Sequence, residues 1–462
     1  MKRVIGVLLI ITLSLFIISC NTTEPPPPPD DEKPTLTLKL EDVSCIEAWI
    51  TLTTTNIQLP ANIALEQISP TGDTTSQILN LNTKDSLLYI DSLLPNQTYQ
   101  CQASSIENPA TSNELSITTL DTTSHIFSYQ TFELGEPLTG NSSILYDVAI
   151  LNENNIWGVG EIYMLDSLGQ SDPEPYAIAH WNGIEWNLMK VYYHDYGTTQ
   201  KFAGKLKTIF AFGPDSIYVC SSANLLKWEN GDWIEKAFFM ISVPFNGQVN
   251  KMWGTSGNNL YFAGNSGAIY HFMGQTWQQI ASGTELPLID IYSIDGNEIY
   301  APGINVSEVK GVLLKGNAAQ FSVMINSEII DESELFEKLY GDLASVWVDE
   351  LGTVYAGGNL LYRYKNNEWN YVTSLPENFI GGNPGSYYRG ALSSIRGNAS
   401  NDYIIAGERN TLRHFNGVTW EQIGLPYSPS SLIGWAKVIQ KGNLAVAVGI
   451  NGSKAFIIIL NN

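Results

Sequence analysis

The chain has 462 residues, which is too long for one ordinary domain and long enough to bury sizeable cores. Its 46 acidic and 24 basic residues give a formal net charge of −22, so the basic surface of a nucleic-acid-binding protein is excluded and attraction to an anionic membrane surface is not favoured. Frequent Gly, Asn, Tyr and Trp residues around short apolar runs favour an all-β fold.

The N-terminus has the features of a targeting segment. Two basic residues precede the apolar stretch Val4–Ser19, which is shorter than the roughly 20 residues that span a bilayer comfortably. The stretch ends in Ile-Ile-Ser-Cys and so resembles the lipobox of bacterial lipoproteins. The resemblance implies that residues 1–19 are a signal peptide and that Cys20 carries the lipid anchor. An ordinary secretory peptide or a signal anchor is the alternative.

Residues 20–34 form an acidic, proline-rich spacer. Five successive prolines, Pro25–Pro29, precede Asp30, Asp31 and Glu32. Such a stretch cannot pack a core, and it favours the stiff polyproline II conformation, which would hold folded domains away from a lipid surface. Asn21 is not the Asp that bacterial sorting reads as inner-membrane retention. The lipoprotein resemblance therefore implies an outer-membrane address, either periplasmic or surface-exposed.

Residues 35–120 predict a β-sandwich. Seven strand-like runs in fewer than 90 residues are typical of this architecture. The segment Leu93–Tyr99 resembles the corner of fibronectin type III domains, in which the Tyr hydroxyl bonds back to nearby backbone. A disulfide between Cys45 and Cys101 stays open: an oxidising compartment would permit it, but strand alternation places the two residues on opposite faces. The predicted strands are 35–40, 46–53, 62–67, 77–81, 87–91, 98–104 and 114–119.

Residues 125–462 contain a repeated phrase. A second apolar strand that ends in small residues, such as Ile156–Gly160, leads to a third strand with an aromatic residue, a tight turn and a closing Trp. The closing residues Trp186, Trp233, Trp277, Trp369 and Trp420 are 47, 44, 92 and 51 positions apart, and Phe321 fills the gap of two periods. A four-stranded unit at this period predicts a β-propeller blade.

The last copy of the repeat lacks its final strand. Six copies lie between about residues 146 and 425, and a seventh begins at Trp435 but ends with the chain after three strands. Because an unpaired strand edge is a liability, we predict that Phe127–Glu133 supplies the missing strand and closes a seven-bladed ring. A six-bladed propeller with a loose C-terminal hairpin is the alternative.

Tests for catalytic motifs are mostly negative. His180, His271 and His414 occupy the same place in three blades, so they would lie on a ring without converging, and we expect them to be structural. The sequence has no metalloprotease, phosphate-loop or nucleophile-elbow motif, and no carboxylate pair is singled out for glycoside hydrolysis. We therefore predict no catalytic residue, no metal site and no cofactor.

Long connections are expected on one face of the propeller. They are residues 161–176, 190–206, 326–342 and 374–390, whereas the opposite turns are mostly short. Loops on a rigid scaffold commonly carry function, and exposed aromatic residues suit sugar or peptide binding. The alternative is that these aromatic residues pack on the rim. The candidate ligand-binding residues are Tyr192, Tyr193, Tyr196, Phe379, Tyr387, Tyr388 and Arg389.

The whole layout resembles outer-envelope lipoproteins of the Bacteroidetes–Ignavibacteria kind, which join a lipobox, a fibronectin type III domain and a propeller with Trp-Gly-Val-Gly and Asn-Gly-x-x-Trp repeats. We expect a non-enzymatic, lipid-anchored protein that binds a glycan or a protein partner. A glycan-active hydrolase or transferase and a purely structural scaffold are the alternatives. A cleft with paired carboxylates would favour the enzyme, and an aromatic-lined surface without such a pair would favour binding.

Overall fold

The computed structural model describes residues 33–462 except 108, 137–139, 196–197, 239–247, 306, 309, 328–338, 373–390 and 427–430. Every helix or strand assigned among these residues is a β-strand, so the predicted all-β class is confirmed. The described part divides into two compact units. The smaller unit comprises the described residues up to Lys39 together with Thr51–Leu87 and Gln100–Leu115, and the larger comprises Leu40–Ile50, Leu88–Tyr99 and the residues from Ser116 onward.

The first seven strands form two sheets, and each overlaps one of the strands predicted from the sequence. Along β6 (Thr98–Ser105), Tyr99, Cys101 and Ala103 are buried and alternate with more exposed residues. The Leu94 N–H donates to the Tyr99 hydroxyl oxygen at 2.8 Å, so the predicted bond from Tyr99 back to nearby backbone is confirmed. One sheet has the order β1 (Thr35–Val43), β2 (Ala48–Thr55), β5 (Asp85–Ile90), and the other β4 (Thr74–Leu81), β3 (Ala61–Ile68), β6, β7 (Leu115–Thr118).

Neither Cys45 nor Cys101 forms a disulfide. Both are buried, and burial raises the pKa of each thiol to about 11. The argument from strand alternation does not apply to Cys45, because this residue lies in a bend before β2, where its thiol contacts the Asp121 carbonyl oxygen at 3.2 Å. Cys220 is also a buried thiol.

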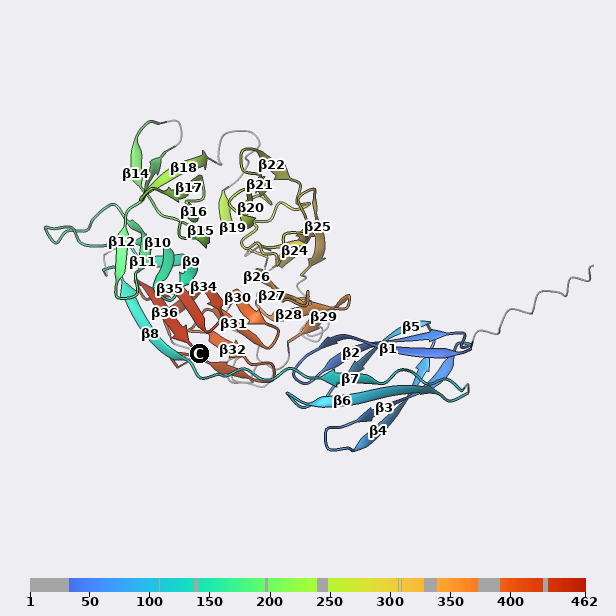
Figure 1. Ribbon diagram of the computed structural model, residues 1–462. Coiled ribbons are helices and arrows are strands. Elements are labelled where there is room, and N and C mark those ends of the chain that lie inside the picture. Colours follow the sequence, from blue (N-terminus) through green and yellow to red (C-terminus); the bar gives the residue numbers. More distant parts are fainter. Residues whose placement is uncertain are drawn as a thin grey trace, which may run out of the picture. The chain divides into compact units, whose positions relative to one another are not determined.

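Seven antiparallel sheets follow and form the blades of a propeller (Figure 1). The strands of the first three blades are β9 (Ile144–Asn152), β10 (Asn155–Ile162), β11 (Tyr176–Trp181) and β12 (Trp186–Met189); β15 (Thr208–Gly213), β16 (Ser216–Cys220), β17 (Asn224–Glu229) and β18 (Asp232–Phe238); and β19 (Val249–Ser256), β20 (Asn259–Gly264), β21 (Ile269–Phe272) and β22 (Trp277–Ile280).

The next three blades contain β23 (Ile299–Asn305), β24 (Lys310–Gly316) and β25 (Phe321–Asn326); β26 (Leu343–Val348), β27 (Val354–Gly358), β28 (Leu361–Lys365) and β29 (Glu368–Tyr371); and β30 (Leu392–Ala399), β31 (Asp402–Gly407), β32 (Leu412–Phe415) and β33 (Trp420–Gln422). In the fourth blade the innermost segment, around residues 288–292, joins β23 only through isolated bridges. Pro302 in β23 has no N–H to donate, which accounts for the broken ladder.

The seventh blade is completed by a strand from before the first blade, as predicted. It contains β34 (Ile433–Lys441), β35 (Leu444–Asn451), β36 (Lys454–Asn461) and β8 (Ser128–Leu134). The β8 strand pairs antiparallel with β36 along its whole length, and β34 packs beside β9 (Figure 1). The ring is therefore closed with seven blades, and the six-bladed alternative is wrong.

A β-bulge recurs near the start of the innermost strand in five blades, and it explains the small residues that end the repeated phrase. The residue before each bulge pairs with a Gly at or near the end of the second strand. At Gly358, an added Cβ would lie 1.7 Å from the Asp342 carbonyl oxygen. The other four glycines are equally confined, with an added Cβ at most 2.4 Å from a carbonyl oxygen: Gly160, Gly264, Gly407 and Gly449.

Candidate binding site

Most of the predicted site residues lie outside the described residues. This applies to Tyr196, Phe379, Tyr387, Tyr388 and Arg389, and to the lipid-attachment residue Cys20. Binding by the long-loop face therefore stays a prediction.

The structure places Tyr192 and Tyr193 on β13 (Tyr192–His194), which pairs with β14 (Lys201–Ala203). Tyr193 is only 5% exposed, donates its hydroxyl to the Lys205 carbonyl oxygen at 2.9 Å, and has its pKa raised to about 12 by burial. The Tyr192 side chain is exposed, and its hydroxyl bonds to Glu174 at 3.1 Å. Tyr193 thus serves the core, and this pair offers at most one aromatic ring to a ligand.

A ring of buried polar residues surrounds the propeller axis, at the start of the inward face of each blade. In the blades with a bulge, the ring residue directly follows the bulged residue. Such bulges are common near functional sites, where they redirect a side chain. Each ring residue is at most 8% exposed, and the ring reads, in chain order, Asp147, Thr208, Lys251, Asp290, Ser345, Ser394 and Lys437.

The ring joins neighbouring blades through hydrogen bonds. At five boundaries, the side-chain oxygen of the ring residue accepts a backbone N–H from the next blade. For example, Asp147 Oδ2 accepts from Ile209 at 3.0 Å, and Asp290 Oδ2 accepts from Val346 at 3.3 Å. The other two boundaries, those after the blades that contain Lys251 and Lys437, lack this bond because an ammonium group cannot accept a hydrogen bond.

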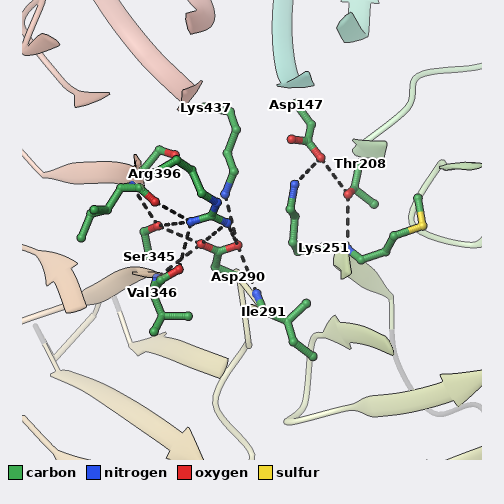
Figure 2. A network of polar contacts seen from close by, with 12 residues as sticks. Asp147, Thr208, Lys251, Asp290, Ile291, Ser345, Val346, Arg396 and Lys437 are labelled. Carbon is green, nitrogen blue, oxygen red and sulfur yellow. Dashed lines mark hydrogen bonds and ion pairs between the residues drawn. The ribbon is translucent and has the colours of Figure 1, made fainter. Parts of the chain in front are cut away.

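The two ring lysines instead reach across to the two ring carboxylates (Figure 2). Lys251 Nζ lies 2.5 Å from Asp147 Oδ2, and Lys437 Nζ lies 3.1 Å from Asp290 Oδ1. Arg396, two residues beyond Ser394 on β30, donates from Nη2 to both oxygens of Asp290 at 2.9 and 3.1 Å. Three basic groups therefore share two carboxylates, and the network carries one excess positive charge when all three are protonated.

This charge balance shifts the pKa values of the network. Burial alone would raise the pKa of Asp290, but Arg396, Lys437 and Lys251 outweigh it and hold that pKa well below its usual range. The pKa of Lys437 is also lowered, but for a lysine this favours the neutral form. Burial, reinforced by repulsion from Arg396 and opposed by Asp290, lowers its pKa to about 7. Near neutral pH, Lys437 is therefore the group of this network that can lose a proton to relieve the excess charge.

A cavity of about 520 Å³ extends along the axis from this network and is lined by the innermost segments of all seven blades. Lys251 and Arg396 are buried lining residues on β19 and β30, whereas Ile294 and Lys441, at the ends of the innermost segments of two other blades, are exposed. The cavity therefore opens toward the ends of the innermost strands, which lead into the short turns. Its aromatic lining residues are Phe210, Trp253, Tyr292 and Trp347.

The sequence analysis missed this site, although a signal was present. Each first apolar run of a blade contains one polar residue at an equivalent place, as in Asp147-Val148-Ala149 and Asp290-Ile291-Tyr292. Aligning the seven runs would have revealed the ring of polar residues. The long connections drew attention to the face opposite the mouth of the cavity.

The three equivalent histidines are structural, as expected. His180, His271 and His414 each contact an Asn or Asp of the neighbouring second strand through Nε2, at 3.1, 2.6 and 2.9 Å. Within the described residues, no group of three or more His, Cys, Asp or Glu residues is placed to hold a metal ion. The same part of the chain contains no helix long and apolar enough to cross a membrane.

The excess charge predicts a pH dependence of stability. Below pH 7, Lys437 is protonated in both the folded and the unfolded states. Between about pH 7 and its unfolded pKa near 10.4, the unfolded chain binds a proton that the folded chain does not, so the free energy of unfolding should rise with pH. Lys437→Met should remove this rise. Urea denaturation at pH 6.5 and 9 measures it, and an equal pH response in both proteins would contradict the assignment.

Comparison with known proteins supports the fold. No protein-family model and no curated protein matches the chain. Among solved structures, YCF48 bound to a D1 peptide is similar at 12% identity with a TM-score of 0.50, over 72% of this chain and 97% of that chain. The WD40 propeller of Doa1 also matches, at 11% identity with a TM-score of 0.48, over 73% of this chain and 98% of that chain. YCF48 from Cyanidioschyzon merolae matches at 11% identity with a TM-score of 0.47, over 72% of this chain and 98% of that chain. At these identities the likeness concerns the fold alone, a β-propeller.

Proposed function

We propose that this protein is a non-catalytic binding protein of the cell envelope, and that its propeller takes a segment of a partner protein into the axial cavity. The carrying observation is the cavity itself, which has aromatic walls and cations at its inner end. A volume of about 520 Å³ lies in the range of ordinary ligand sites and accommodates one or two side chains of an extended segment.

The arrangement of the carboxylates favours binding over glycoside hydrolysis. A glycosidase needs two carboxylates that face the substrate, one of them an acid with a raised pKa. Asp147 and Asp290 are the buried carboxylates of the axis, but neither lines the cavity. Asp290 is held by Arg396, Lys437, Ser345 and backbone N–H groups, and its pKa is lowered, so it cannot serve as a proton donor near neutral pH.

A protein partner is favoured over a glycan. One of the similar propellers, YCF48, has been solved with a bound peptide, so this fold can hold a peptide. A glycan site would call for exposed aromatic platforms, and among the predicted aromatic residues that the structure describes only Tyr192 is exposed. Glycan binding by the long connections stays a separate prediction from the sequence.

The envelope location is the other part of the proposal. It rests on the lipobox-like residues that end at Cys20 and on the proline-rich acidic spacer after them. Growth with a labelled fatty acid tests it in a bacterial host that processes lipoproteins. The full chain should incorporate label and Cys20→Ser should not; label in both would rule out Cys20 as the attachment site.

A peptide library displayed against the full chain in detergent tests the binding proposal. Ala149→Trp fills the cavity from β9, and Ile294→Trp obstructs it at an exposed position. Ile184→Trp, at an 85% exposed position outside the cavity lining, is the matched control. We expect peptides that bind the wild type and Ile184→Trp but neither cavity variant. Peptides that bind all four proteins equally, or glycans that bind while no peptide does, would contradict the proposal.

A further inference from the structure

The axial network contains one positive charge that no carboxylate of the axis offsets. We infer that the cavity is an anion site, selective for a carboxylate carried on an apolar group. The inference deepens the proposed function and rests on it for the role of the cavity, because it names the chemistry of the segment that enters: a C-terminal carboxylate or an acidic side chain.

The three cations of the axial network are buried. Lys251, Arg396 and Lys437 are each at most 8% exposed, and among the described residues the carboxylates that pair with them are those of Asp147 and Asp290. An uncompensated charge in such a place is costly, so it is removed by loss of a proton or by binding of an anion. The chain as a whole is strongly acidic, with a net charge of −22, so this local excess of positive charge runs against its general composition.

The hydrogen-bonding capacity at the inner end of the cavity points the same way. The Lys251 ammonium group has three N–H donors, and the structure gives it one acceptor among the described residues, Asp147 Oδ2. Lys251 also lines the cavity. A carboxylate oxygen at the inner end of the cavity could therefore accept from Lys251 while the ion pair with Asp147 stays in place.

The aromatic lining of the cavity favours a carboxylate that is attached to an apolar group. The Arg396 guanidinium lies 4.9 Å from the centre of the Tyr292 ring, so its flat face is already covered by an aromatic group. Trp253 and Phe210 also line the cavity. Small, strongly hydrated anions gain nothing from these walls, whereas a carboxylate on a hydrophobic residue buries apolar surface as well.

Binding of a carboxylate should be linked to proton uptake. The groups that act on Lys437 are Arg396, Asp290, Lys251 and Asp147. A new negative charge beside this cluster offsets the repulsion from Arg396 and Lys251, so it favours protonated Lys437. Affinity should therefore fall as pH rises from 6.5 to 8.5, in contrast to the affinity of a neutral ligand.

Calorimetric titration of the full chain in detergent tests the inference with four defined probes. N-acetylphenylalanine imitates a C-terminus, and N-acetylphenylalaninamide is its neutral partner. N-acetylglutamic acid α-amide imitates an acidic side chain, and N-acetylglutamine amide is its neutral partner. We expect at least one acid to bind at least about tenfold more tightly than its amide, the gain typical of a charge-assisted hydrogen bond. The acid that binds more tightly identifies the source of the carboxylate.

Two matched variants complete the test. Lys437→Met removes the excess charge and should reduce the preference for the acid to less than about threefold, which is below the gain from a charge-assisted bond. Lys454→Met, on β36 of the same blade and outside the cavity lining, makes the same chemical change and should keep the preference. Equal binding of acid and amide, no binding of any probe, or an unchanged preference in Lys437→Met would overturn the inference.

The outcomes of the two tests are separable. If the acids bind but no library peptide does, the anion site stands and the protein partner falls. If peptides bind in the cavity without regard to charge, the proposed function stands and this inference falls.

Discussion

Replacing Asp290 by Asn should lower the free energy of unfolding by about 3–5 kcal/mol, the cost of breaking a buried ion pair by removing one partner. The carboxylate is 1% exposed and holds Arg396 and Lys437. It also accepts from the Ser345 hydroxyl and the Val346 N–H of the next blade. An amide cannot neutralise either cation, so Arg396 would stay charged without its partner and Lys437 would have to be buried as an unpaired charge or lose its proton.

Guanidinium denaturation, followed through the tryptophan fluorescence of the propeller, measures this loss. Asp295→Asn is the matched control, because Asp295 lies in the exposed turn of the same blade, and it should change the free energy of unfolding by no more than about 0.5 kcal/mol. Adding Lys437→Met to Asp290→Asn should recover part of the loss, since one of the unpaired cations is then gone. A loss below about 1 kcal/mol for Asp290→Asn would contradict the described role of the network.

Replacing Gly358 by Ala should cost at least about 3 kcal/mol, because the clash can be relieved only by moving backbone. The added Cβ would lie 1.7 Å from the Asp342 carbonyl oxygen and 3.1 Å from Leu343 Cα, at the bulge that precedes the ring residue Ser345. The strand pair β26–β27 would have to separate there, and Ser345 would lose its alignment with Asp290.

Gly213→Ala is the control for this prediction. Gly213 also lies in a propeller strand, but an added Cβ meets nothing within 4 Å there. Its effect on the free energy of unfolding should stay within about 0.5 kcal/mol, the range of substitutions at unconstrained surface positions. Similar effects at Gly358 and Gly213 would show that the bulge does not require glycine.

The axial network is costly for a protein that needed only a stable ring. Buried ion pairs can often be replaced by well-packed apolar residues without loss of stability, and an unpaired buried cation is worse than either. Five of the seven ring positions already show the cheaper solution, in which a hydroxyl or carboxylate oxygen accepts from the next blade. The excess cation therefore needs an explanation beyond folding, and ligand binding provides one.

The sequence predicted the features that depend on local patterns. The period of the closing tryptophans and the missing last strand together led to β8 as the closing strand, and the structure pairs it with β36. The Leu-Pro-x-x-x-Tyr corner likewise led to the bond between Leu94 and Tyr99. Both inferences needed only the spacing of residues within one repeat or one turn.

The axial site depends instead on partners that are far apart in the chain. Lys251 and Asp147 are 104 positions apart, and Lys437 and Asp290 are 147 apart. No periodic pattern pairs them, because the contacts cross the ring and join blades that are not neighbours. The burial of Tyr193 was equally hard to foresee, since it accompanies the short hairpin β13–β14 inside a connection that was expected to present its aromatic residues to a ligand.

The most direct test of the axial site is a crystal structure of the full chain soaked with N-acetyl-4-bromophenylalanine. The anomalous signal of bromine locates the probe without reference to any assumed site. The account predicts one bromine peak among Phe210, Trp253 and Tyr292, with the carboxylate about 3 Å from Lys251 Nζ. Bromine bound only at the outer loops or between blades, with the axis unoccupied, would contradict it.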